Sequence, residues 1–134
     1  MHHSRFCALV IDCKAEDLDA ATTFWSQAFG RTVVPHPPTP DTQNYRELTA
    51  SKDEPMILLQ KVDHDSRVHL DIETDDIEAE VKRLEALGAR RVAFVKRWWV
   101  LEAPTGQRFC VVRPQRGPLN ASNANAWGDG ATTP

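Results

Sequence analysis

A histidine and two acids alternate with aliphatic residues in one short stretch of the sequence. Residues 68–76 read V-H-L-D-I-E-T-D-D, so His69, Asp71 and Glu73 stand at every second position. Side chains two residues apart on a β-strand point to the same face. A strand here therefore presents an imidazole beside a carboxylate. Such a pair can bind a polar ligand or move a proton, while a hydrogen-bonded pair inside the core is the plainer alternative.

The elements that follow this stretch predict a helix and then three strands. Apolar residues recur at helical spacing over 75–88, where Asp75 or Asp76 caps the start and Gly88 ends the helix. The strands are expected over R-R-V-A-F-V, R-W-W-V-L-E-A and Q-R-F-C-V-V-R-P, with a P-T-G turn between the last two.

The first half of the chain predicts the same order of elements. We expect a buried strand over 5–13, a helix over 17–30 and strands over Y-R-E-L-T and P-M-I-L-L-Q-K-V, with R-T-V-V-P as a short additional strand. The segment D-L-D-A at residue 17 matches D-I-E-A at residue 76, an offset of 59 residues. A duplication at this period is typical of two similar units that pack into one body.

The composition is that of a soluble globular protein. The chain has 134 residues, of which 41% are hydrophobic and 26% charged. This predicts one domain over 1–114, with a first repeat at about 5–62 and a second at about 67–114. A net charge of −3 gives no electrostatic reason to expect nucleic acid or a membrane surface as a partner. No signal peptide or spanning segment is visible, so we expect a cytoplasmic protein.

The cysteines and the C-terminal segment complete the pattern. Cys7, Cys13 and Cys110 are odd in number and lack a C-x-x-C spacing, which favours reduced, buried thiols over a disulfide framework. Residues 115–134 show no periodicity that supports a helix or a strand. We expect a tail that is flexible or docked through Trp127.

Three motifs together resemble the vicinal oxygen chelate superfamily, which includes glyoxalase I, bleomycin-resistance proteins and extradiol dioxygenases. They are L-D-A-A-T-T-F-W-S-Q-A-F-G-R, H-L-D-I-E-T-D-D-I-E-A-E-V-K-R-L-E-A-L-G-A and L-E-A-P-T-G-Q-R-F-C-V-V, and the resemblance spans residues 6–114. It implies an α+β fold in which two βαβββ units form a cupped, mixed eight-stranded sheet around a cavity. Fold alone does not fix an activity, since one fold hosts many chemistries.

The resemblance also implies four places for metal ligands, on the first and last strands of each repeat. In this sequence those places hold Ala8 or Val10, Leu58 or Gln60, His69, and Cys110. This gives one good ligand, one possible ligand and no carboxylate, whereas a catalytic site takes about three protein ligands. We therefore expect no standard metal site and no cofactor, with His69 as the weak candidate ligand if a divalent metal does bind.

We interpret the chain as a glyoxalase-like protein that binds a small molecule in its cavity, and the sequence leaves catalysis open. The candidate ligand-binding residues are His69, Asp71, Gln60, Trp98, Val100 and Cys110. One alternative is a metal-dependent lyase, isomerase or dioxygenase with a non-standard ligand set. Another is a non-catalytic interaction domain. A homodimer is compatible with all three.

Overall fold

The computed structural model describes residues 1–40 and 42–128 and contains, among them, two helices and eight strands. The bounds in chain order are β1 His2–Cys13, α1 Leu18–Phe29, β2 Tyr45–Leu48, β3 Met56–Lys61, β4 Arg67–Thr74, α2 Ile77–Ala86, β5 Arg90–Val95, β6 Trp98–Glu102, β7 Arg108–Val112 and β8 Asn125–Trp127. The strand order is β2-β3-β1-β4-β7-β6-β5, with β8 paired to β1. The predicted mixed eight-stranded α+β fold is confirmed.

The chain divides into two compact units, and each is described by itself. One unit comprises Ala8–His69, and the other comprises Met1–Cys7 and the chain from Leu70 onward. We call them the 8–69 unit and the 70–128 unit. Strands β1 and β4 each pass from one unit into the other, because the divisions fall inside these two strands.

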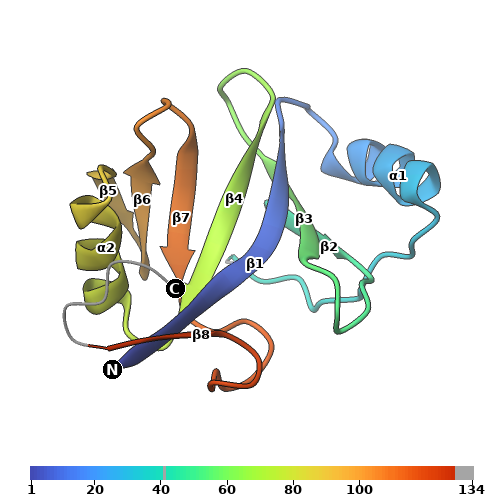
Figure 1. Ribbon diagram of the computed structural model, residues 1–134. Helices are drawn as coiled ribbons and strands as arrows, with labels where there is room; N and C mark the ends of the chain where they lie inside the picture. Colours follow the sequence, from blue (N-terminus) through green and yellow to red (C-terminus); the bar gives the residue numbers. More distant parts are fainter. Residues whose placement is uncertain (41, 129–134) are drawn as a thin grey trace. The chain divides into compact units, whose positions relative to one another are not determined.

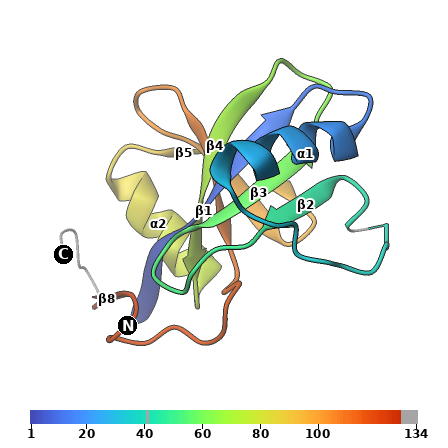
Figure 2. The same cartoon turned by 90° about the vertical axis from the view of Figure 1, so that its right-hand side faces the viewer.

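In the 8–69 unit, one helix covers one face of three strands. β1 pairs in parallel with β3, and β3 pairs antiparallel with β2. Figure 2 shows α1 alongside β3. The core beneath the helix is aliphatic and contains Ile11, Cys13, Leu18, Leu48 and Leu59, with Trp25 packed at its margin. This burial follows from the apolar run of β1 and the helical spacing of the apolar residues in α1.

The segment R-T-V-V-P does not form the short strand predicted from the sequence. It contributes a single bridge, between Val33 and Leu48. Pro35 ends this segment and supplies no backbone N–H for a longer ladder. The first repeat therefore has three strands, and the eighth strand of the sheet comes from the C-terminal segment.

In the 70–128 unit, α2 packs on β5, β6 and β7 (Figure 1). β4 pairs in parallel with β7, which pairs antiparallel with β6, which in turn pairs antiparallel with β5. The core under α2 contains Val81, Leu84, Leu101 and Val111, with Trp99 packed against it. Since Trp98 precedes Trp99 on a strand, its side chain faces away from this core.

The two helices begin in the same way. Asp17 caps α1 by accepting hydrogen bonds from the backbone N–H groups of Asp19 and Ala20. Asp76 caps α2 by accepting one from Ala79. Both aspartates satisfy donors that a helix start leaves unpaired. Among the described residues, no helix is both long enough and apolar enough to cross a membrane.

The C-terminal segment contains a strand that the sequence did not predict. β8 pairs antiparallel with the start of β1, and Trp127 aligns with His2 (Figure 1). Trp127 is buried, with 4% of its surface exposed. Within the described residues, the segment through residue 128 is thus part of the 70–128 unit, and the rest of the predicted tail, 129–134, lies outside the described residues.

Candidate ligand-binding site

A buried aspartate holds the imidazole of His69 in the 8–69 unit. Nδ1 of His69 lies 2.8 Å from Oδ2 of Asp12, and the Asp12 side chain is only 2% exposed. Because an ionised carboxylate can only accept, the imidazole donates from Nδ1. This fixes the ring orientation and leaves Nε2 as the lone-pair nitrogen of the neutral imidazole.

The surroundings of Asp12 combine burial with positive charge. Nε of Arg67 lies 3.8 Å from the same Oδ2 atom, and half of the arginine side chain is exposed. Burying a carboxylate is unfavourable unless it is paired, and His69 and Arg67 supply that pairing. The second oxygen, Oδ1, is buried and has no hydrogen-bond partner among the described residues. The carboxylate therefore retains acceptor capacity after it has oriented His69.

Two further polar side chains continue from Asp12 across the strands of this unit. Asp12 is aligned with Gln60 on β3, and Gln60 is aligned with Tyr45 on β2. Nε2 of Gln60 donates a hydrogen bond of 2.8 Å to Oη of Tyr45. Aligned residues on paired strands share a face, so Tyr45, Gln60 and Asp12 form one polar row. We call this the first row.

A second row of aligned residues lies in the 70–128 unit. Asp71 on β4 is aligned with Cys110 on β7, and Cys110 is aligned with Val100 on β6. Asp71 is 9% exposed and Cys110 is 8% exposed. Trp98 lies two residues before Val100 and therefore shares its face, although it is outside the row.

The two rows occupy equivalent places in the two repeats. Asp12 stands five residues before the helix cap Asp17, and Asp71 stands five residues before the cap Asp76. Strand pairing then makes Gln60 the counterpart of Cys110. By the same offset of 59, His69 corresponds to Val10, which is buried in β1. The alternatives left open by the sequence, Ala8 and Leu58, are not the counterparts.

The structure groups the predicted site residues by unit. Gln60 and His69 both lie beside Asp12 in one unit, whereas Asp71, Cys110 and Val100 share the second row in the other. Sequence reasoning missed Asp12, Tyr45 and Arg67. Asp12 could have been found from the duplication, because its spacing to the following cap equals that of Asp71. Tyr45 could not, since its four-residue strand carries no clear alternation.

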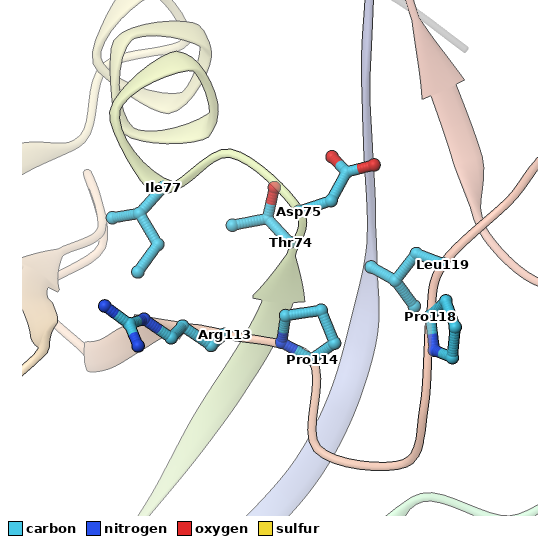
Figure 3. A pocket seen from close by; sticks show the side chains of 7 residues that line it. All are labelled: Thr74, Asp75, Ile77, Arg113, Pro114, Pro118 and Leu119. Atoms are coloured by element: carbon cyan, nitrogen blue, oxygen red, sulfur yellow. The ribbon is translucent and has the colours of Figure 1, made fainter.

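An open pocket in the 70–128 unit contains none of the predicted site residues. It has a volume of about 540 Å³ and is lined by Thr74, Asp75, Ile77, Arg113, Pro114, Pro118 and Leu119 (Figure 3). The Asp75 carboxylate, which points away from Arg113 in this view, accepts two 2.7 Å hydrogen bonds from His3. The Thr74 hydroxyl donates to the His3 carbonyl. These polar groups already serve the attachment of β1.

The three cysteines are free and buried, and two of them have raised thiol pKa values. Burial raises the pKa of Cys7 to about 12, and the nearby carboxylates of Glu73 and Asp71 add to the effect. Burial also raises the pKa of Cys13, with a smaller contribution from Asp12. A nucleophilic cysteine needs a lowered pKa, so neither thiol has the properties of a nucleophile.

The fold is that of the glyoxalase and bleomycin-resistance proteins. The chain is similar to methylmalonyl-CoA epimerase from Mycobacterium tuberculosis, with 21% identity over 82% of this chain and 87% of that one, and a TM-score of 0.57. A glyoxalase/bleomycin resistance protein/dioxygenase superfamily member from Vibrio splendidus shares 19% identity over 81% and 98% of the two chains, with a TM-score of 0.50. At these identities the likeness concerns the fold.

A third similar structure is an extradiol ring-cleaving dioxygenase from B. fuscum. It shares 15% identity and has a TM-score of 0.55, and the match covers 86% of this chain but 34% of the dioxygenase. The family model of the glyoxalase-like domain matches residues 8–112. The chain therefore belongs to the glyoxalase-like domain family. No curated protein matches its sequence.

The metal set implied by the superfamily does not fit these residues. Val10 and Cys110 stand at two of the four ligand places, and Val10 offers no donor atom. Gln60 already donates to Tyr45, and Nδ1 of His69 faces Asp12. The 8–69 unit thus offers at most the Gln60 carbonyl oxygen and Nε2 of His69 from those places, fewer than the three or so protein ligands of a catalytic site.

Proposed function

We propose that the chain binds a small polar molecule through Asp12, His69 and Gln60, without the standard metal set of the superfamily. The observation that carries the proposal is the Asp12–His69 contact of 2.8 Å, made by a carboxylate that is 2% exposed. A buried ion pair adds little net stability compared with apolar residues of similar volume, so stability alone is a weak reason for this contact. Ligand sites, in contrast, place a few polar groups on an otherwise apolar strand framework.

The chemistry of the first row indicates what kind of ligand it fits. Asp12 retains acceptor capacity at Oδ1, and Gln60 retains its carbonyl oxygen while its amide nitrogen donates to Tyr45. Both groups accept hydrogen bonds. Because Oδ1 of Asp12 is buried, we assign the Gln60 carbonyl oxygen to a hydroxyl or N–H donor of the ligand. Arg67, which lies near Asp12 and is half exposed, adds a cation that favours a ligand with a carbonyl or carboxylate group.

The same residues are suited to proton transfer. A carboxylate that accepts from Nδ1 orients the imidazole and stabilises its protonated form, while Nε2 exchanges the proton with a substrate. Turnover of the bound molecule, if present, would therefore depend on His69 as acid or base and on Asp12 as the positioning residue.

Ligand screening of three full-length proteins tests the binding proposal. Wild-type protein, His69→Gln and His64→Gln would be compared by thermal shift against a library of hydroxy acids, sugars and other polar metabolites. His64 is an exposed histidine in the same unit, so it is the matched control. We expect compounds that raise the melting temperature of wild type and His64→Gln but not of His69→Gln. Equal shifts in all three proteins would refute the site.

Metal analysis of protein purified without chelator tests the metal-free part of the proposal. We expect less than about 0.1 equivalent of Fe, Mn, Ni or Zn, because the four superfamily places hold an imidazole, an amide and a buried thiol but no carboxylate. A stoichiometric metal that is lost in His69→Gln would replace this proposal with the metal-dependent enzyme. If neither a metal nor a ligand binds, the interaction-domain alternative takes its place.

A further inference from the structure

β8 fills a site built from the edge of β1 and one face of α2. In the antiparallel pairing, His2 aligns with Trp127, His3 with Ala126 and Ser4 with Asn125. The other side of β1 is occupied here as well, since the His3 carbonyl accepts from Asp75 N–H and from the Thr74 hydroxyl. The side that β8 occupies would otherwise be an open strand edge, which readily pairs with another segment.

The Trp127 side chain is recognised by three different interactions. Its Nε1 donates a 2.9 Å hydrogen bond to Oγ of Ser4. The Arg83 guanidinium lies over the ring, 3.8 Å from its centroid. The side chain is almost fully buried, at 4% exposure. Burial, an indole hydrogen bond and a cation–π contact together select tryptophan over other apolar residues.

The residues that receive Trp127 are positioned without help from β8. Nε and one terminal nitrogen of Arg83 each donate a 2.8 Å hydrogen bond to the two oxygens of Glu80. Nε2 of His2 lies 2.8 Å from Oε1 of Glu80, which is fully buried. Bidentate, charge-assisted pairs of this kind fix the plane of the guanidinium. The site that receives Trp127, which we call the acceptor site, is therefore organised before β8 binds.

β8 is held by few strand contacts and is connected to β7 by a long irregular segment. β8 has three residues, and residues 113–124 between β7 and β8 contain no helix or strand. Both β8 and the β1 residues 2–4 lie outside the part of the chain that matches the glyoxalase-like domain, residues 8–112. The paired strands therefore lie outside the family match, whereas Glu80 and Arg83 of the same site lie within it.

We propose that this acceptor site also binds the C-terminal segment of a second copy of the chain. Exchange of identical segments reproduces every contact of the closed form, which makes it a low-cost route to a dimer. The chain's own segment competes at an effective concentration in the millimolar range. Occupancy in trans therefore rises with protein concentration. The site shares no residue with the first row, so the proposal stands independently of ligand binding.

Cross-linking between two full-length variants tests exchange directly. One chain carries His3→Cys, the other carries Ala126→Cys, and the two positions are aligned across β1 and β8. We expect a disulfide-linked heterodimer under mild oxidation, in a yield that rises with protein concentration. The matched control replaces Ala126→Cys with Ala121→Cys, an exposed position in the same segment. A heterodimer yield equal to that of the control would refute exchange.

A second arm separates tryptophan recognition from chance collisions of the segment. Adding Trp127→Ala to the Ala126→Cys chain should abolish the cross-link, and a cross-link that persists would refute recognition by Trp127. Full-length Trp127→Ala should bind a synthetic peptide of residues 121–128, A-S-N-A-N-A-W-G, about tenfold more tightly than wild type, whose own segment competes. The same peptide with alanine at the tryptophan should not bind.

If Trp127→Ala does not fold, Trp127→Phe is used, because it retains an aromatic ring and removes only the indole N–H. No peptide binding by a folded variant would overturn the acceptor site. Binding of both peptides with equal affinity would overturn its selectivity for tryptophan.

Discussion

The two rows differ in chemistry although they occupy equivalent places in the two repeats. Each contains a buried aspartate five residues before a helix cap. Beside Asp12 the row continues with Gln60 and Tyr45, whereas beside Asp71 it continues with Cys110 and Val100. The repeats thus share the framework that positions a carboxylate, and they differ in the neighbours that determine what the carboxylate can do.

In the helices it is the second repeat that has the polar side chains. By the offset of 59, Glu80 and Arg83 of α2 correspond to Ala21 and Phe24 of α1. Phe24 is 62% exposed, while Arg83 stacks on Trp127. The row of the first repeat therefore continues with polar side chains, and the second repeat places the charged pair Glu80 and Arg83 beside Trp127 of β8. The two repeats thus carry their distinctive polar groups on different elements of a similar framework.

The largest effect is expected from Glu80→Ala. The mutation removes the partner of Arg83 and His2 inside the 70–128 unit and should lower the free energy of unfolding by about 3–5 kcal/mol. Urea denaturation measures the change. Glu78→Ala on the same helix is the control, because Glu78 is half exposed and pairs with Arg91 at the surface, where a pair contributes about 0–1 kcal/mol. Similar losses in both variants would contradict a special role of the Glu80 network.

The next largest effect should distinguish the two rows directly. Asp12→Asn should weaken binding of a ligand found in the screen by about 10- to 100-fold, because hydrogen bonds to a charged group contribute about 1.5–3 kcal/mol. Asp71→Asn should change the affinity by less than about threefold. Isothermal titration calorimetry measures both constants. The reverse order would move the site to the second row.

A smaller difference is expected between the glycines that follow the two helices. Gly30 has φ of 67° and an added Cβ would meet no atom, so Gly30→Ala should cost about 1 kcal/mol of stability. Gly88 has φ of 111°, and an added Cβ would lie 3.1 Å from Cγ of Pro104. Gly88→Ala should therefore cost about 2 kcal/mol or more. Thermal unfolding compares the variants. Equal losses would mean that Pro104 moves away from the added Cβ at little cost.

The smallest effect is the acid dependence of the Glu80 network. Burial acts to raise the pKa of Glu80, but hydrogen bonds from Arg83, His2 and Ser4 outweigh it, so the pKa is lower than the ordinary 4.5. A lowered folded-state pKa contributes stability that is present above the unfolded value and lost as the pH falls through the folded value. Wild type should lose stability below pH 4.5 more steeply than Glu80→Gln, as measured by urea denaturation at several pH values. Parallel profiles would contradict the assignment.

The fold was predictable where local patterns agree with the final packing. The caps at Asp17 and Asp76 and the apolar faces of both helices follow from residue type and spacing. β8 was not predictable, because three residues without alternation become a strand only when the edge of β1 and the Trp127 contacts are present. Val33 shows the converse, since strand-forming residues before Pro35 produced only one bridge.

The candidate site was predictable only in part. His69 and Gln60 were found from alternation and from the family resemblance. Asp12 was hidden in an apolar run, where a charged residue looks like an interruption of a buried strand. Its partnership with His69 joins strands that are far apart in sequence, and no spacing rule within one element can reveal such a contact. The duplication offers the only signal, through its equivalence to Asp71.

The buried thiol of Cys7 has a practical consequence for labelling chemistry. Burial raises the pKa of Cys7 to about 12, so the thiol stays protonated near neutral pH. Burial raises the pKa of Cys13 as well, and Cys110 is buried. Since alkylation and disulfide exchange require an accessible thiolate, a cysteine introduced at an exposed position such as Asn125 should react long before these native thiols. The folded wild-type chain is in effect a cysteine-free background for attaching a fluorophore or a spin label.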